Sequence, residues 1–244
     1  MDRRRIDAAR APSAATRLSE LRPSTRDFTQ YLGVGRSGIA IVPLVARQAA
    51  DSDVAIVFPE DLAGFIAAAD ELEIGAFAVA SNPSADAVRL DDLRVVSSAG
   101  TAPVLRFDAI ADEREVYESR AAGADAVLVP LARSGDALPG LLGVARALHM
   151  AVVAEVASEA ECRAAVDAGA LVIALAATRL SLASEIPERY PLLALDAADE
   201  PENLAPLLGV VDGVVLGRAI FAARDPLARL RAFVDAAAAL PVKS

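Results

Sequence analysis

Short apolar runs alternate with longer amphipathic stretches along most of the chain. Runs of this kind are typical of strands that are buried on both faces of a parallel sheet. The eight runs cover residues 38–45, 76–80, 103–105, 126–129, 151–156, 171–176, 192–195 and 213–216. The amphipathic stretches predict helices over residues 60–72, 114–122, 138–148, 159–168 and 226–240.

The ends of these stretches carry residues that start and stop helices. Ser158 and Glu161 have the spacing of a capping box, and Asp225 before Pro226 is typical of an N-cap followed by a first-turn proline. Three glycines separate a helical stretch from a strand and predict left-handed turns: Gly75, Gly123 and Gly169.

Eightfold alternation of strand and helix predicts an α/β fold, a single (β/α)8 TIM barrel, with a doubly wound open sheet as the alternative. Because no linker or change of composition divides the chain, we expect one domain. We expect the barrel over residues 36–244, after an N-terminal extension with an extra helix over residues 1–35. In such a barrel the functional groups lie at the carboxyl ends of the strands.

Composition narrows the classes of function. The chain has 244 residues and a net charge of −10, which argues against a nucleic-acid partner. Because it has one Cys and one His, an internal disulfide and a Cys/His zinc site are excluded, and we expect no metal and no cofactor. The sequence has no uncharged apolar run of about 18 residues and no apolar stretch after its basic start. We therefore expect a cytoplasmic protein without membrane contact.

Residues near the predicted strand ends resemble the indole-3-glycerol phosphate synthase family. The resemblance is carried by residues 103–110, which include Arg106 and Asp108, and by residues 121–128, 153–156 and 215–220. It implies a (β/α)8 barrel of tryptophan biosynthesis, a lyase that closes the pyrrole ring by decarboxylation and dehydration.

The catalytic positions implied by the resemblance differ in this chain. The family has lysines on the first and third strands, an asparagine on the sixth and a glutamate on the seventh. These positions are taken here by Pro43, Phe107, the stretch at Ala176 and Leu195. Only the fifth-strand glutamate, Glu155, is retained, and Lys243 is the only lysine in the chain. Since one general acid or base contributes about 10²–10⁴-fold, we expect the ring closure to be lost or much weakened.

Glu155 is the candidate catalytic residue, because an ionised carboxylate in an apolar run is costly unless it is used or paired. It acts either as a base or orienting group at the barrel mouth, or as a relic paired with an arginine. Arg106 and Asp108 are candidate ligand contacts, with a structural Arg–Asp pair as the alternative. They point away from Phe107 if the strand continues.

Further candidates follow the last strands. Arg179 and Asp196 are expected to contact the ligand. Gly217 and Arg218 open a short helix after the eighth strand, where free N–H groups favour a phosphate or carboxylate. The resemblance implies a glycine where Ala197 stands, so only part of a phosphate site is present.

Three functions follow from these residues, and the sequence leaves open whether the chain is an enzyme. The first is a pseudoenzyme, a synthase-like barrel without ring closure that binds a small anionic or aromatic metabolite or acts beside a protein partner. The second is an active or repurposed lyase of tryptophan or indole metabolism that uses Glu155 with Arg106, Asp196 or Arg179. The third is a purely structural protein whose old pocket is filled by apolar side chains.

Overall fold

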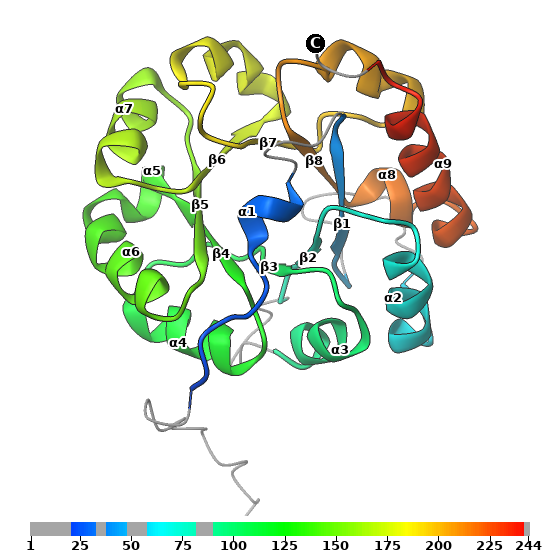
Figure 1. Cartoon of the computed structure of the whole chain (residues 1–244), viewed down its shortest axis with the longest axis horizontal. Helices are drawn as coiled ribbons and strands as arrows, with labels where there is room; N and C mark the ends of the chain where they lie inside the picture. Colours follow the sequence, from blue (N-terminus) through cyan, green and yellow to red (C-terminus); the bar gives the residue numbers. More distant parts are fainter. Residues whose placement is uncertain (1–20, 33–37, 48–57, 82–89, 242–244) are drawn as a thin grey trace, which may run out of the picture.

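The computed structural model describes residues 21–32, 38–47, 58–81 and 90–241. Eight parallel strands close into a barrel in chain order, and the last strand pairs with the first. Figure 1 views this barrel from the end where the strands begin. The predicted (β/α)8 barrel is therefore confirmed, and the open sheet is wrong because its edge strands would be unpaired.

All eight predicted strands are present, each with ends within two residues of the prediction. They are β1 (Ala40–Val45), β2 (Phe77–Val79), β3 (Val104–Arg106), β4 (Ala126–Pro130), β5 (Ala151–Glu155), β6 (Val172–Ala176), β7 (Leu192–Leu195) and β8 (Gly213–Leu216). They form because each run is short, apolar and β-branched enough to be buried on both faces.

Helices surround the barrel (Figure 1). The five predicted helices correspond to α2 (Leu62–Asp70), α4 (Glu113–Ala121), α6 (Leu138–Ala147), α7 (Glu159–Ala168) and α9 (Pro226–Ala238). Further helices are α1 (Phe28–Tyr31), α3 (Asp91–Ala99), α5 (Leu131–Ser134) and α8 (Arg218–Phe221). Short 3-10 segments complete the ring: η2 (Gly135–Ala137), η3 (Ala177–Glu185) and η4 (Pro201–Leu207).

Side chains at the predicted helix starts accept hydrogen bonds from backbone N–H groups of the first turn. The Asp225 carboxylate accepts a hydrogen bond from Ala228 N at 3.0 Å, so the predicted N-cap of α9 is confirmed. Ser158 caps α7 by accepting from Glu161 N at 3.3 Å. The Glu161 carboxylate bonds to Ala157 N rather than to Ser158 N, so only half of the predicted capping box forms.

The predicted left-handed turns are confirmed at two glycines and wrong at the third. Gly123 and Gly169 have φ values of 99° and 82°. In the turn before β2 the left-handed residue is Glu73, with φ 57°, and not Gly75. Gly75 is needed for space, since a Cβ there would lie 2.7 Å from the Cβ of Ala40.

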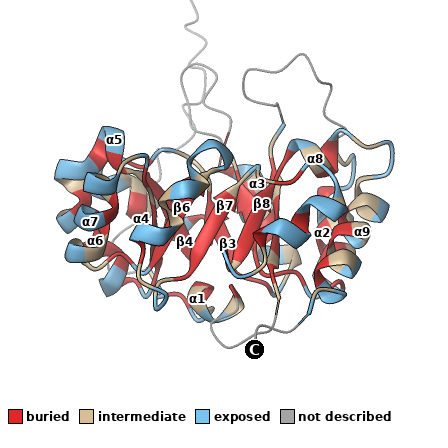
Figure 2. Ribbon diagram, turned by 90° about the horizontal axis from the view of Figure 1, so that it is seen from above, coloured by how far each residue is buried: buried red, intermediate tan, exposed pale blue. Residues whose placement is uncertain are grey.

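Two apolar layers form the core. The outer layer lies between strands and helices, and the inner layer fills the barrel. The strands between the two layers are coloured as buried in Figure 2. Many inner residues are alanines, because side chains from eight strands converge on the axis. Phe28 and Leu32, from α1 and the residue that ends it, belong to the inner layer and are 1% and 0% exposed. The short helix α1 thus closes the barrel at the amino ends of the strands.

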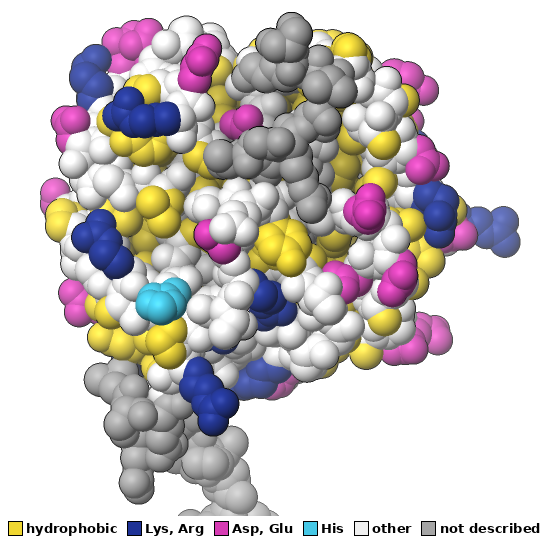
Figure 3. All heavy atoms as spheres, viewed as in Figure 1, with side chains coloured by type: hydrophobic (Ala, Val, Ile, Leu, Met, Phe, Trp, Pro, Cys, Tyr) yellow, Lys and Arg dark blue, Asp and Glu magenta, His cyan; other side chains and the backbone are white. Residues whose placement is uncertain are grey.

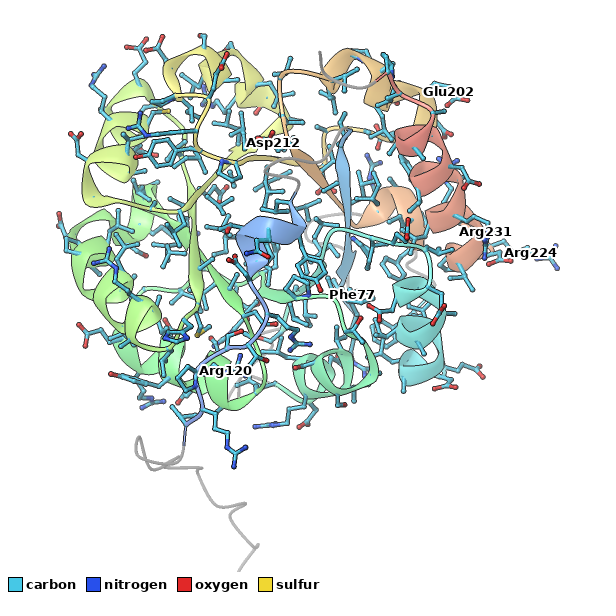
Figure 4. All side chains as sticks on the ribbon, viewed as in Figure 1. Phe77, Arg120, Glu202, Asp212, Arg224 and Arg231 are labelled. Atoms are coloured by element: carbon cyan, nitrogen blue, oxygen red, sulfur yellow. The ribbon has the colours of Figure 1, made fainter. Side chains whose placement is uncertain are left out.

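A buried carboxylate fastens the N-terminal segment under the barrel. Asp125 is 1% exposed and accepts hydrogen bonds from Ser24 Oγ at 2.6 Å and Val104 N at 2.9 Å. It also forms ion pairs with Arg26 Nε at 2.8 Å and Arg120 Nη1 at 3.0 Å. Figure 4 shows Arg120 on α4, beside this segment.

The expected boundary between the N-terminal extension and the barrel falls on residues that the structure does not describe. The extra helix is present as α1, but residues 1–20 and 33–37 lie outside the described residues, and so does the expected boundary near residue 35. No helix in the described part of the chain has the length and apolar character needed to cross a membrane. On the face shown in Figure 3, acidic and basic side chains are interspersed with apolar ones.

Candidate functional site

One set of side chains points into the barrel at the carboxyl ends of the strands. Side chains alternate between the two faces of a strand, so the residue two positions after an inner-layer residue also points inward. We call the last of these residues, one from each strand, the mouth ring: Leu44, Ala80, Phe107, Pro130, Glu155, Ala176, Leu195 and Gly217. The ring carries one ionisable side chain, Glu155.

The first strand corrects one sequence-based placement. Val42 belongs to the inner layer and Leu44 packs against it, so Pro43 between them faces outward. The expectation that Pro43 fills the mouth is therefore wrong by one residue. The mouth position is taken by Leu44, which like Pro43 is uncharged.

Glu155 ends β5 opposite Pro130 of β4 and beside Ala174 of β6. It is half-buried, and no described residue donates a hydrogen bond to its carboxylate. Burial raises the pKa of Glu155, and this effect outweighs the field of Arg133, which lowers the pKa; Glu161 raises it further. The carboxylate is thus poised to take a proton or a hydrogen-bond donor.

Arg106 and Asp108 form the structural pair that the sequence left as one alternative. The Arg106 guanidinium lies between β3 and α4, where Nε contacts Asp108 at 2.7 Å and Nη1 donates to Ser119 Oγ at 3.1 Å. Asp108 also accepts hydrogen bonds from the N–H and the hydroxyl of Ser81, at the end of β2. Arg106 is 2% exposed and directed away from Phe107 and the barrel interior. The pair joins the ends of β2 and β3.

The corner expected to hold a phosphate contains a carboxylate of the chain itself. Asp196 follows β7 with φ 49°, and its Oδ1 accepts a hydrogen bond from Gly217 N at 3.4 Å. A carboxylate therefore occupies part of the space in which an anion would meet this N–H. Asp196 and Gly217 are brought together, although the sequence assigned them to different groups.

The two remaining candidate cations are exposed. Arg218 on α8 forms an ion pair with Asp199 at 2.7 Å, with exposed fractions of 53% and 71% for the two side chains. Arg179 lies on η3 and is exposed. Ion pairs this exposed contribute about 0–1 kcal/mol. The structure therefore does not bring Arg106, Arg179 and Arg218 together at one ligand.

Sequence reasoning missed Arg133, Ser81 and Leu44. Arg133 follows β4 on α5, so its place after an apolar run was a usable signal. Strict alternation from Val42 would have identified Leu44. The link from Ser81 to Asp108 spans 27 positions and had no local signal.

Other features of the described residues lie away from the mouth. One cavity of about 400 Å³ is bordered by Ala151 and Val152, and one of about 460 Å³ by Leu192 and Asp212. All four residues are at the amino ends of strands, opposite the functional end of this fold. In the described part of the chain, no three His, Cys, Asp or Glu side chains are placed to share a metal ion.

The fold and the mouth ring define a (β/α)8 barrel with a site at the carboxyl ends of its strands. Residues 3–233 match the family model for indole-3-glycerol phosphate synthase, and the chain belongs to that family.

Three relatives, each named indole-3-glycerol phosphate synthase, are similar to this chain. The Streptomyces griseus protein is 32% identical over 162 residues, which cover 61% of this chain and 60% of the relative. The Kineococcus radiotolerans protein is 29% identical over 218 residues, 83% of this chain and 77% of the relative. The Micrococcus luteus protein is 31% identical over 196 residues, with coverages of 78% and 73%. The chain thus spans 60% of the length of the first of these relatives.

Proposed function

We propose that this chain is a diverged member of the family that lacks efficient ring closure and binds a small metabolite at the barrel mouth. The observation that carries the proposal is the mouth ring, in which Glu155 is the single ionisable side chain. The sequence left anionic and aromatic ligands open. The apolar ring, with Phe107 packed on the inner layer, favours the aromatic class.

The chemistry of the ring argues against the ancestral reaction. Ring closure with loss of carbon dioxide and water needs a proton donor, a proton acceptor and groups that hold the substrate's charges. Leu44, Phe107 and Leu195 transfer no proton and hold no charge. One general acid or base contributes about 10²–10⁴-fold, and such contributions are not additive, so the loss is large without being their simple product.

The same ring suits an aromatic ligand. An offset or edge-to-face contact between a ligand ring and Phe107 contributes about 0.5–1.5 kcal/mol beyond the burial of area. Leu44 and Leu195 supply further apolar surface on other strands. Apolar surface of this kind gains affinity for a ligand mainly by being removed from water.

A second candidate is a lyase that uses Glu155, and a specific observation favours it. Burial raises the pKa of this carboxyl group, which is how proteins prepare an acidic side chain for proton transfer near neutral pH. The names of the relatives point to the same reaction class. Arg133, rather than Arg106, is the cation whose field acts on this carboxylate.

Turnover of 1-(2-carboxyphenylamino)-1-deoxyribulose 5-phosphate, followed by indole fluorescence, separates the two candidates. The chain contains no Trp, so the protein contributes little background. The matched variants are Glu155→Gln and Glu202→Gln, because Glu202 lies at the rim of the molecule far from the barrel axis (Figure 4).

We expect no turnover, or turnover reduced by several orders of magnitude, from folded wild-type protein. Turnover at an ordinary enzymatic rate that is abolished by Glu155→Gln and unchanged by Glu202→Gln would establish the lyase and overturn the first proposal.

A further inference from the structure

We infer that the barrel mouth recognises a primary ammonium group carried on an aromatic ring, and that it discriminates against ligands with a carboxylate or phosphate in the same place. The inference rests on the proposed function, because it assumes an aromatic ligand at the mouth. Two independent observations carry it: the Glu155 carboxylate without a donor, and the Asp196 carboxylate on the Gly217 N–H.

The half-buried carboxylate of Glu155 has no hydrogen-bond partner among the described residues. Its neighbours Pro130 and Ala174 have no side-chain donor, and no described residue donates a hydrogen bond to its carboxylate. Partial burial removes some of the water around this carboxylate and so disfavours its ionised form, as its raised pKa indicates. An ammonium group donates three N–H bonds and cancels the charge, so it supplies what the site lacks.

Arg133 is the cation of the chain itself whose field acts on Glu155, and it would compete with a ligand ammonium for this carboxylate. It is exposed on α5, and it forms no ion pair with Glu155 among the described residues. Its field lowers the pKa of Glu155, but burial raises it more. The field of Arg133 therefore does not fully offset the effect of burial on the Glu155 carboxylate. A ligand ammonium that binds Glu155 does not have to displace an ion pair between the two residues.

The corner at Gly217 repels an anion for a separate reason. An anionic group that accepts a hydrogen bond from Gly217 N would lie beside the Asp196 carboxylate, which already contacts this N–H at 3.4 Å. Like charges at such separations repel strongly where water is partly excluded. Arg218 is paired with Asp199 at 2.7 Å, so it offsets this repulsion less than an unpaired arginine would, although the exposed pair is weak.

Phe107 adds to the preference for a cation. Its ring packs on the inner layer from the third strand, and its face attracts a positive charge held within about 6 Å. The ligand class that combines these features is an arylalkylamine, with its ammonium directed at Glu155 and its ring at the apolar residues of the mouth ring.

Binding of three indoles tests the inference: one carries an ammonium side chain, one has no side chain and one carries a carboxylate side chain. The probes are tryptamine, indole and indole-3-acetate, and their own fluorescence reports binding because the chain has no Trp. At pH 8 we expect tryptamine to bind about tenfold more tightly than indole, and indole-3-acetate to bind most weakly. Indole-3-acetate binding as tightly as tryptamine would overturn the inference and leave the proposed aromatic site standing.

Substitutions at Glu155 and Asp196 test which side chains set the preference among the three probes. We expect Glu155→Gln to lower tryptamine affinity about tenfold while indole affinity stays the same. Asp196→Asn should raise the affinity for indole-3-acetate, and Glu202→Gln, far from the mouth, should change none of the three. A preference for tryptamine that survives Glu155→Gln in folded protein would overturn the assignment to this carboxylate. Failure of all three probes to bind folded wild-type protein would overturn the proposed function itself.

Discussion

The two ends of the barrel differ in how a carboxylate is surrounded: Asp125 is buried at one end, and Glu155 is half-buried at the other. At the amino end, Asp125 is almost fully enclosed and receives hydrogen bonds or ion pairs from four different residues. At the carboxyl end, Glu155 receives none from the described residues and keeps a raised pKa because of burial. Removing a partner from the enclosed carboxylate should be costly, whereas the half-buried one is the group that we propose for ligand contact.

The surroundings of the two carboxylates show the same contrast. The amino end is closed by Phe28 and Leu32, which continue the inner apolar layer below the strands. The mouth ring at the other end is apolar but not covered by any described element of this kind. The enclosed carboxylate and the proposed ligand site therefore lie at opposite ends of one barrel, and substitutions at each end should have different effects.

The largest effect is expected from Asp125→Ala. The substitution removes contacts to Ser24, Arg26 and Arg120 and leaves Arg26 without its buried counter-ion. Breaking a buried pair in this way costs about 3–5 kcal/mol. Urea unfolding followed by circular dichroism measures it.

The control for this loss is Asp91→Ala. Asp91 is 82% exposed in its ion pair with Arg94, and such a pair contributes about 0–1 kcal/mol. Equal losses for the two variants would show that the network around Asp125 does not hold the amino end together.

Phe28→Ala should destabilise the protein by about 3 kcal/mol. The side chain is 1% exposed in the inner layer, and truncation leaves a cavity at the end of the barrel. Urea unfolding with tyrosine fluorescence and circular dichroism as parallel probes measures the loss. A loss below about 1 kcal/mol would mean that α1 unfolds separately from the barrel and does not close it cooperatively.

The smallest effect, with the opposite sign, is expected from Glu155→Gln. Burial raises the pKa of Glu155 in the folded state, so between the unfolded and folded pKa values the folded protein binds more protons. Wild-type stability therefore falls as the pH rises through this interval. Glutamine carries no charge, so the variant should gain a few tenths to about 1 kcal/mol above the interval.

Thermal unfolding from about pH 4 to about pH 8 checks this sign. The advantage of Glu155→Gln should appear as the pH rises, and Glu202→Gln, which alters a charge at the rim, should show no such trend. A variant that becomes less stable than wild type as the pH rises would mean that Glu155 has a favourable partner, and the contrast between the two ends would fail.

The fold was predictable because strand burial is a local property of the sequence. All eight apolar runs became strands, since a parallel barrel buries both faces of each strand and leaves an uninterrupted apolar signal. The helix α3 was missed although its acidic first turn is a usual signal of a helix start; its apolar positions are few. Its buried residues are Leu93 and Val96.

The site was less predictable because it depends on side-chain direction and on distant partners. A shift of one residue exchanges the two faces of a strand, which is why Pro43 was placed where Leu44 stands. The direction of Arg106 is set by Ser119, 13 positions away, and the enclosure of Asp125 by Ser24, 101 positions away. No local pattern encodes such contacts.

The mouth ring has a consequence for how this barrel can change. Leu44 contacts none of the residues that enclose Asp125, because the two sites lie at opposite ends of the strands. Substitutions of well-separated residues affect stability almost additively. A charged residue can therefore be introduced at Leu44 or Leu195 by single substitutions while the contacts of Asp125 stay intact. The architecture keeps the mouth open to new chemistry while the rest of the sequence continues to specify the same fold.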